Sequence, residues 1–323
     1  MSIETKDKIL QHVQKPTRYT GGEMNVCIKD PKNVDVRFAF CFPDVYEIAM
    51  SHLGIKILYH ILNLRADTYC ERVFAPWPDM EQEMRSRDMK LFALESSDEI
   101  TNFDIVGFTL QYELSYSNIV NMLDLADIPI WAKDRDKSHP FVCAGGPCAY
   151  NGEPIADFID FFMLGEGEEV IGEVVDVYIK WKKEGGKSRQ DYLAEIAKIE
   201  GVYVPSFYDV EYYADGRVQS IIPNHPNAKP SVRKRIMADF DKTIAPDKII
   251  VPFGEIVHDR VMLELFRGCI RGCRFCQAGY IYRPVRERRA ETLSQLADSL
   301  LESSGYDEIS LSSLSTSDYR ELP

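Results

Sequence analysis

Short apolar runs alternate with helix-periodic segments along the first half of the chain, and this alternation restricts the fold most. The apolar runs occupy residues 37–42, 104–110 and 140–144. Apolar side chains recur every three or four residues over 45–61 and 119–125, as on one face of a helix. Strands that alternate with helices favour a parallel sheet with helices on both faces. The sequence therefore predicts an α/β fold whose N-terminal part is a doubly wound, Rossmann-type parallel sheet.

The last part of the chain repeats this alternation around a group of cysteines. Residues 261–266 form an apolar run before the cysteines. Leucines at helical spacing follow over 293–301, and Gly305 can end that helix in the left-handed conformation. Residues 308–314 then form a second predicted strand. This order is typical of the first units of a partial TIM-type (βα) barrel, whose active groups lie at the carboxyl ends of its strands.

Three of the eight cysteines are clustered as Cys269-Ile-Arg-Gly-Cys273-Arg-Phe-Cys276. Thiolates are soft ligands that suit iron–sulfur clusters or zinc. A structural zinc site needs a fourth ligand, and the nearest histidine, His258, precedes the predicted strand. A [4Fe–4S] cluster held by three thiolates has one iron open to a substrate or cofactor. The spacing predicts such a cluster, and a non-catalytic iron–sulfur or zinc module is the alternative.

This C-x3-C-x2-C run, with an aromatic residue before its third cysteine, resembles the hallmark of the radical S-adenosylmethionine (SAM) superfamily. The resemblance implies that Cys269, Cys273 and Cys276 hold three irons of a [4Fe–4S] cluster. It further implies that SAM binds the fourth iron and is cleaved to a 5′-deoxyadenosyl radical, with electrons from a flavodoxin- or ferredoxin-type donor. The family's Gly-Gly-Glu at the end of strand two is absent here, and polar residues 315–318 stand in its place. The SAM contacts expected from the resemblance are Phe275, Ser315, Ser317 and Asp318.

The loops after the predicted N-terminal strands resemble the cobalamin (B12)-binding-type domain that precedes the radical SAM barrel in one large class of these enzymes. The resemblance rests on Gly-Gly-Pro at 145–147, Glu-Pro-Ile-Ala-Asp-Phe at 153–158 and Gly-Glu-Gly-Glu at 165–168, in that order. The D-x-H-x-x-G motif that ligates cobalt in some such domains is absent. Axial histidine ligation is therefore not expected, and His52 is interpreted as a helix-surface or core histidine. The expected cobalamin contacts are Asp44, Gly145, Gly146, Glu166 and Gly167.

Arginine is concentrated in residues 260–289 of an otherwise acidic chain. The net charge of −13 argues against a broad basic surface for nucleic acid. Residues 260–289 nevertheless contain eight arginines and two glutamates. By resemblance to groups in which such a segment lines the substrate entrance, Arg283 and Arg286 are expected to contact substrate. The other interpretation is a solvated connection whose arginines pair with acidic residues elsewhere.

The predicted organisation is a cobalamin-binding-like α/β domain over 1–200, a hairpin and Pro-rich linker over 201–260, and the first βαβ portion of a radical SAM core over 261–323. A whole barrel takes about 200 residues. The chain is therefore expected to be a fragment, inactive without the remainder of the core. The sequence has neither a membrane-length apolar run nor a signal-like N-terminus, which indicates a cytoplasmic protein without a membrane partner.

The predicted function is that of the N-terminal part of a cobalamin-class radical SAM enzyme that acts on an unidentified substrate. Its cofactors are expected to be a [4Fe–4S] cluster and SAM. Cobalamin bound without a protein axial ligand is favoured as a third cofactor, and a domain that keeps the fold but has lost cobalamin is the alternative. A methylthiotransferase-like enzyme that modifies RNA or the ribosome is an alternative, which the net charge does not support.

Overall fold

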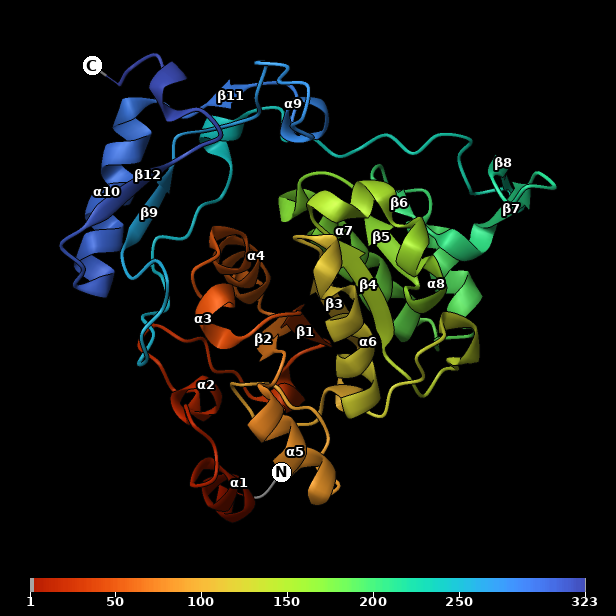
Figure 1. Ribbon diagram of the computed structural model, residues 1–323, viewed down its shortest axis with the longest axis horizontal. Coiled ribbons are helices and arrows are strands. Elements are labelled where there is room, and N and C mark those ends of the chain that lie inside the picture. Colours follow the sequence, from red (N-terminus) through yellow and green to blue (C-terminus); the bar gives the residue numbers. More distant parts are fainter. Residues whose placement is uncertain (1–2, 323) are drawn as a thin grey trace.

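A six-stranded sheet organises most of the computed structural model, which describes residues 3–322 (Figure 1). Its strand order is β2-β1-β3-β4-β5-β6, and every neighbouring pair is parallel except β5 and β6. The strands are β1 (Val36–Phe42), β2 (Thr68–Phe74), β3 (Ile105–Thr109), β4 (Phe141–Gly145), β5 (Phe161–Met163) and β6 (Val202–Tyr203). The predicted α/β fold with a mostly parallel sheet is confirmed. In sheets of this order, ligands bind beyond the carboxyl ends of the strands, where the order switches beside β1.

Helices cover both faces of this sheet because successive side chains of a buried strand point to opposite faces. Phe38 and Phe40 of β1 pack with α4, α7 and α8, whereas Ala39 and Cys41 pack with α1, α5 and α6. The helices of this part are α1 (Ile3–Leu10), α2 (Thr17–Thr20), α3 (Tyr46–Ala49), α4 (Leu53–Leu64), α5 (Pro78–Ser86), α6 (Tyr116–Leu125), α7 (Gly167–Lys183) and α8 (Arg189–Ile196).

Strand β2 was not predicted from the sequence, although all seven of its residues are buried. Two of these residues are Glu71 and Arg72, and both are paired in the interior. Glu71 forms an ion pair of 2.5 Å with Arg37 of β1. Arg72 forms ion pairs with both Glu23 and Glu95. The buried charges of β2 are therefore compensated by segments that lie far from it in the sequence.

The chain leaves the sheet through an exposed hairpin. β6 joins the sheet after residue 200, and β7 (Tyr208–Tyr212) then pairs with β8 (Val218–Pro223). The segment that follows returns to the sheet, where Arg235 forms an isolated parallel bridge with Gly165. This bridge brings the linker against the carboxyl end of β5.

The C-terminal part is a βαβ unit built on a small separate core. β9 (Val261–Glu264) pairs in parallel with β12 (Ile309–Ser312), and α10 (Ala290–Ser304) connects them (Figure 1). Gly305 ends α10 with a φ of 73°, the predicted left-handed cap. The cysteine loop and α9 (Ala278–Ile281) lie between β10 (Phe266–Arg267) and β11 (Arg286–Glu287), which pair antiparallel. Within residues 3–322, no helix has both the length and the apolar character needed to cross a membrane.

Candidate functional site

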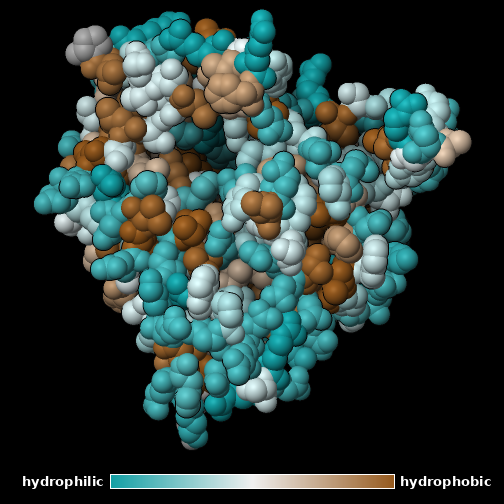
Figure 2. All heavy atoms as spheres, in the orientation of Figure 1, coloured by the Kyte–Doolittle hydropathy of each residue, from teal (hydrophilic) through white to brown (hydrophobic). Residues whose placement is uncertain are grey.

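A cavity of about 800 Å³ lies between the carboxyl edge of the sheet and the C-terminal βαβ unit. Figure 2 shows the surface hollowed between these two parts. The strand ends that line the cavity are Phe42 of β1, Thr109 of β3, Gly145 of β4 and Met163 of β5. Its volume is in the range of sites for small molecules and cofactors. The cavity therefore occupies the position where this sheet topology binds ligands.

The deeper wall of the cavity is apolar and lies between the sheet and two of its helices. Phe38 and Phe40 of β1 face Ile57 and Leu58 of α4, and Ile171 of α7 lines the same region. These side chains belong to the hydrophobic core between the sheet and helices α4 and α7. A flat or extended apolar group can bury its surface here at the expense of water.

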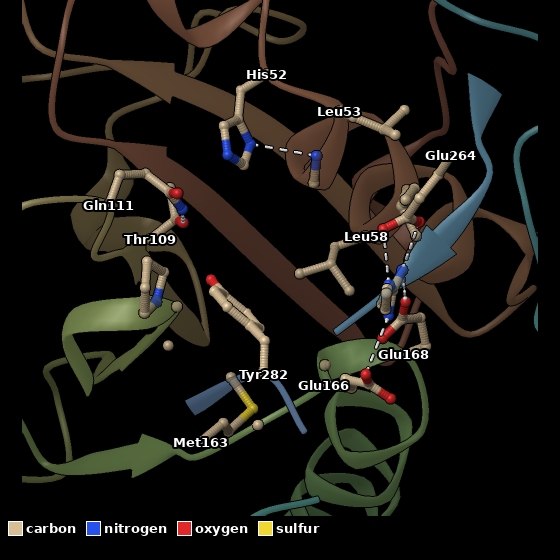
Figure 3. A pocket seen from close by; sticks show the side chains of 18 of the residues that line it. His52, Leu53, Leu58, Thr109, Gln111, Met163, Glu166, Glu168, Glu264 and Tyr282 are labelled. Atoms are coloured by element: carbon tan, nitrogen blue, oxygen red, sulfur yellow. Dashed lines mark hydrogen bonds and ion pairs between the residues drawn. The ribbon is translucent and has the colours of Figure 1, made fainter. Parts of the chain in front are cut away.

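Polar side chains also line the cavity, among them His52, Thr109, Gln111 and Tyr282, which are labelled in Figure 3. Burial raises the pKa of Tyr282, and it raises the pKa of Tyr150 to about 12. Both phenols are therefore neutral hydrogen-bond donors at physiological pH. None of these four residues was predicted as a site residue, although Thr109 and Gln111 lie at the end of the predicted strand 104–110, where ligand-binding loops are expected.

His52 lies at the start of α4, and its ring has one nitrogen already engaged. Nδ1 accepts a hydrogen bond of 3.2 Å from the backbone N–H of Gly54, which caps the helix. The neutral ring therefore carries its proton on Nε2. Burial lowers the pKa of His52 and the nearby Lys56 acts in the same direction, against a hydrogen bond from Gln111. A neutral His52 with Nε2 protonated has no free lone pair for a metal.

Four of the five residues expected to contact cobalamin line the cavity, namely Gly145, Gly146, Glu166 and Gly167. Asp44 does not line it. Its carboxylate accepts a hydrogen bond of 2.8 Å from the hydroxyl of Tyr112, which does. The structure thus brings the four loop residues together and keeps Asp44 one side chain away.

Glycines of these loops are needed for contacts within the chain itself. At Gly146, a Cβ would lie 2.8 Å from the carbonyl oxygen of Leu110. At Gly165, with a φ of +104°, a Cβ would lie 2.6 Å from the nitrogen of Arg235 and closer still to its oxygen. Gly165 therefore admits the linker to the end of β5.

Gly165→Ala is expected to destabilise the protein by about 2–3 kcal/mol, because the substitution combines backbone strain with a clash against backbone atoms. Denaturant unfolding measures this. The control is Gly185→Ala, at a φ of +94° with nothing within 4 Å of the new Cβ. It should cost about 1 kcal/mol from strain alone. Equal losses in the two variants would mean that the Arg235 contact is unimportant.

Ion pairs join the loop at the start of α7 to the C-terminal part across the cavity. Glu166 accepts bonds of 2.5 and 2.6 Å from Arg286, and Glu168 lies 2.5 Å from Arg267. Arg267 also binds Glu264 at 2.8 Å. All five residues line the cavity. Glu166 and Arg286, expected to contact cobalamin and substrate respectively, are thus paired with each other.

The other arginines of residues 260–289 are mostly engaged as well. Arg271 pairs with Asp318 and Arg289 with Asp241, whereas Arg288 donates to backbone carbonyls. Arg283 is exposed and lines the cavity, and over residues 3–322 its side chain has no polar partner. The expected pairing of these arginines with acidic residues is thus found for most of them, but Arg267, Arg286 and Arg288 are largely buried rather than solvated.

The three clustered cysteines lie on the exposed loop after β10. All are free thiols; Cys273 is exposed, whereas Cys269 and Cys276 are half-buried. Among residues 3–322, no three His, Cys, Asp or Glu side chains are gathered in an arrangement that holds a metal. The donor set itself suits iron or zinc, since three thiols share one eight-residue segment. The structure therefore fits such a metal by ligand type and does not display a preassembled site.

Residues expected to contact SAM lie on and opposite this loop. Phe275 is 93% exposed. Arg271 of the loop donates to the carboxylate of Asp318 through Nε at 2.8 Å, and Ser315 donates to the same carboxylate at 2.7 Å. Asp318 is thus tied to the cysteine loop, as is Ser315 through it. For Ser317 no polar side-chain contact is found within residues 3–322.

Part of the chain is similar to a known protein family. Residues 54–205 match the family of radical SAM proteins, N-terminal. The match covers a little under half of the chain. The chain is also 28% identical over 300 residues to an uncharacterized protein of Methanocaldococcus jannaschii, a match that covers 91% of this chain and 52% of the relative. The chain thus spans about half the length of this relative.

Two solved structures resemble the chain as a whole. One is the cobalamin-dependent SAM radical enzyme OxsB with aqua-cobalamin and SAM bound, with a TM-score of 0.49 and 14% identity over 86% of this chain and 34% of that one. The other is the radical SAM methyltransferase TsrM of Kitasatospora setae with cobalamin and a [4Fe–4S] cluster bound. Its TM-score is 0.48, with 13% identity over 87% of this chain and 50% of that one.

Proposed function

We propose that the chain is the N-terminal part of a radical SAM enzyme that holds a corrinoid in the cavity and a [4Fe–4S] cluster with SAM at the cysteine loop. The observation that carries the proposal is the cavity, walled by the domain that matches the radical SAM N-terminal family on one side and by β10 and the chain that follows the cysteine loop on the other. A ligand in this cavity would lie beside the residues that lead into and out of the cysteine loop. The substrate of the enzyme is left open.

The residues of the cavity suit a large ligand with an apolar face and polar edges. Phe38, Phe40 and Leu58 exclude water from the deep part, and Tyr150 and Tyr282 offer neutral hydrogen-bond donors. Because Nδ1 of His52 is engaged with Gly54, we propose that His52 would not be a ligand of the corrinoid metal.

At the cysteine loop, Cys269, Cys273 and Cys276 would supply thiolates. A reduced [4Fe–4S] cluster there would supply the electron that cleaves SAM to a 5′-deoxyadenosyl radical. Phe275 offers an exposed ring for stacking, and Arg271 holds Asp318 where its carboxylate can accept hydrogen bonds from an ammonium group. Ser315 donates to the same oxygen of that carboxylate as Nε of Arg271 does.

Anaerobic reconstitution of the full chain with iron and sulfide should give a reduced [4Fe–4S] signal in electron paramagnetic resonance that shifts when SAM is added. Cys269→Ala, Cys273→Ala and Cys276→Ala should each abolish the SAM-responsive signal, because each removes one of three protein ligands. The control is Cys27→Ala, a half-buried cysteine outside the loop.

The result that contradicts the proposal is equally clear. Zinc in place of iron, or a cluster whose signal does not respond to SAM, would assign the loop to a non-catalytic metal module.

A further inference from the structure

The cysteine loop begins directly after a residue that is anchored on the sheet domain. Arg267 is the last residue of β10 and Cys269 follows it by two positions. Its side chain is 15% exposed and forms ion pairs with Glu264 of β9 at 2.8 Å and with Glu168 of α7 at 2.5 Å, and Glu166 lies farther away at 3.9 Å. Glu168 and Glu166 both belong to the N-terminal domain, and Glu168 is the nearer of the two.

Gly268 joins Arg267 to the cysteine loop, and its backbone conformation is tightly restricted. Its φ is +97°, and a Cβ there would lie 2.6 Å from the carbonyl oxygen of Tyr282. The next residue, Cys269, donates its backbone N–H to the same oxygen at 3.1 Å. The two ends of the cysteine loop are therefore packed against each other at the point where Arg267 anchors them.

Glu168 is well placed to hold this anchor. Its side chain is only 6% exposed, so solvent and salt weaken its attraction to Arg267 less than at an open surface. It lies in the first turn of the 17-residue helix α7, where the helix dipole favours a carboxylate. Neighbouring Glu169 is 48% exposed and pairs with Arg235 of the linker instead.

From this geometry we infer that Glu168 is a positioning residue for the cysteine loop: through Arg267 and Gly268 it fixes the loop on the N-terminal domain and against the cavity. The inference deepens the proposed function and rests on it for the role of the loop. It adds a dependence of the cysteines on one carboxylate of another domain.

The test is the rate at which iodoacetamide alkylates each cysteine of the full chain without cofactors, followed by mass spectrometry. In Glu168→Gln, Cys269 and Cys276 should react with iodoacetamide roughly tenfold faster. The reason is that the charged hydrogen bond between Glu168 and Arg267, which helps to hold the loop in place, is then lost. Glu168→Asp, which keeps the charge, should restore part of the protection. Cys27, half-buried and outside the loop, is the internal reference whose rate should not change.

Glu169→Gln is the matched control, because it removes the neighbouring carboxylate and its ion pair with Arg235. It should leave the rates of Cys269 and Cys276 within about twofold of the original, as expected for an exposed pair. Equal rates in Glu168→Gln and Glu169→Gln would overturn the inference, as would a rise in Cys27 of the same size, which would indicate general loosening.

A second arm separates this inference from the proposed function. Cyanocobalamin should slow alkylation of Cys269 in the unmodified chain, because Glu168, Arg267 and Gly268 all line the cavity. Equilibrium dialysis reports whether cyanocobalamin is retained. If it is not, the corrinoid proposal fails, whereas the comparison of Glu168→Gln with Glu169→Gln still decides the role of Glu168.

Discussion

Arg72→Met is expected to destabilise the protein by about 3–5 kcal/mol at pH 7. Arg72 is 1% exposed, and its guanidinium donates to Glu23 at 2.9 and 3.1 Å and to Glu95 at 2.7 Å. Methionine fills similar space without charge, so the loss comes from two carboxylates left in the interior without a cation. Urea unfolding followed by circular dichroism measures it.

The control for this prediction is Arg85→Met on α5. Arg85 also pairs with two carboxylates, Glu81 at 2.8 Å and Asp124 at 2.9 Å, but its side chain is 46% exposed. Exposed ion pairs contribute little, so we expect a change below about 1 kcal/mol. A loss of similar size in Arg72→Met would mean that the pairing of Arg72 in the interior adds nothing to stability.

The loss in the free energy of unfolding caused by Arg72→Met should depend on pH. Burial alone would raise the pKa of Glu23, but the charge and hydrogen bonds of Arg72 outweigh it, so this pKa lies below its ordinary value. A lowered pKa in the folded state stabilises the fold above the ordinary Glu pKa of about 4.3, and the contribution is lost as the pH falls. The free energy of unfolding of Arg72→Met should therefore differ most from that of the unmodified protein near pH 7. This difference should become smaller below about pH 4.

The same charges explain why part of the fold could not be predicted from the sequence. β1, β3 and β4 are continuous apolar runs and were predicted within about one residue of their bounds. β2 reads Thr-Tyr-Cys-Glu-Arg-Val-Phe, and its two central charges interrupt the apolar pattern. Their partners, Arg37, Glu23 and Glu95, come from three separate segments that meet only in the folded chain.

The candidate site divides in the same way. Gly145, Gly146 and Glu166 belong to loops that follow strands, and such loops meet at one edge of a parallel sheet. His52 was interpreted as a helix-surface or core histidine and Tyr282 lies in the arginine-rich segment, so neither was predicted to line a ligand site. They become lining residues only after α4 and the chain beyond the cysteine loop have packed over the sheet edge. The arginines show the opposite case, in which a signal in the sequence is altered by folding. Residues 260–289 are basic in the sequence, but most of this charge is neutralised in the folded chain, where Glu166, Glu168 and acidic residues of the C-terminal part lie against it.

Leu58→Trp is expected to weaken the binding of hydroxocobalamin to the full chain by roughly 10- to 100-fold. Leu58 lines the deep, apolar part of the cavity, and its methyl groups would lie 3.1 and 3.3 Å from a Cβ at Gly167. The larger indole would occupy space that a ligand needs, and overpacking of this kind costs about 1–3 kcal/mol at the site where it occurs. The visible spectrum of retained corrinoid after gel filtration, titrated against protein concentration, measures the loss.

Leu64→Trp provides the comparison on the same helix, because Leu64 ends α4 and is 60% exposed. It adds the same indole outside the cavity and should bind hydroxocobalamin as the unmodified chain does. Both variants should unfold at similar urea concentrations, since Leu58 is only half-buried and faces open space. If Leu58→Trp binds as tightly as Leu64→Trp, the corrinoid is held elsewhere, and the cavity between the sheet and the βαβ unit must serve a different ligand.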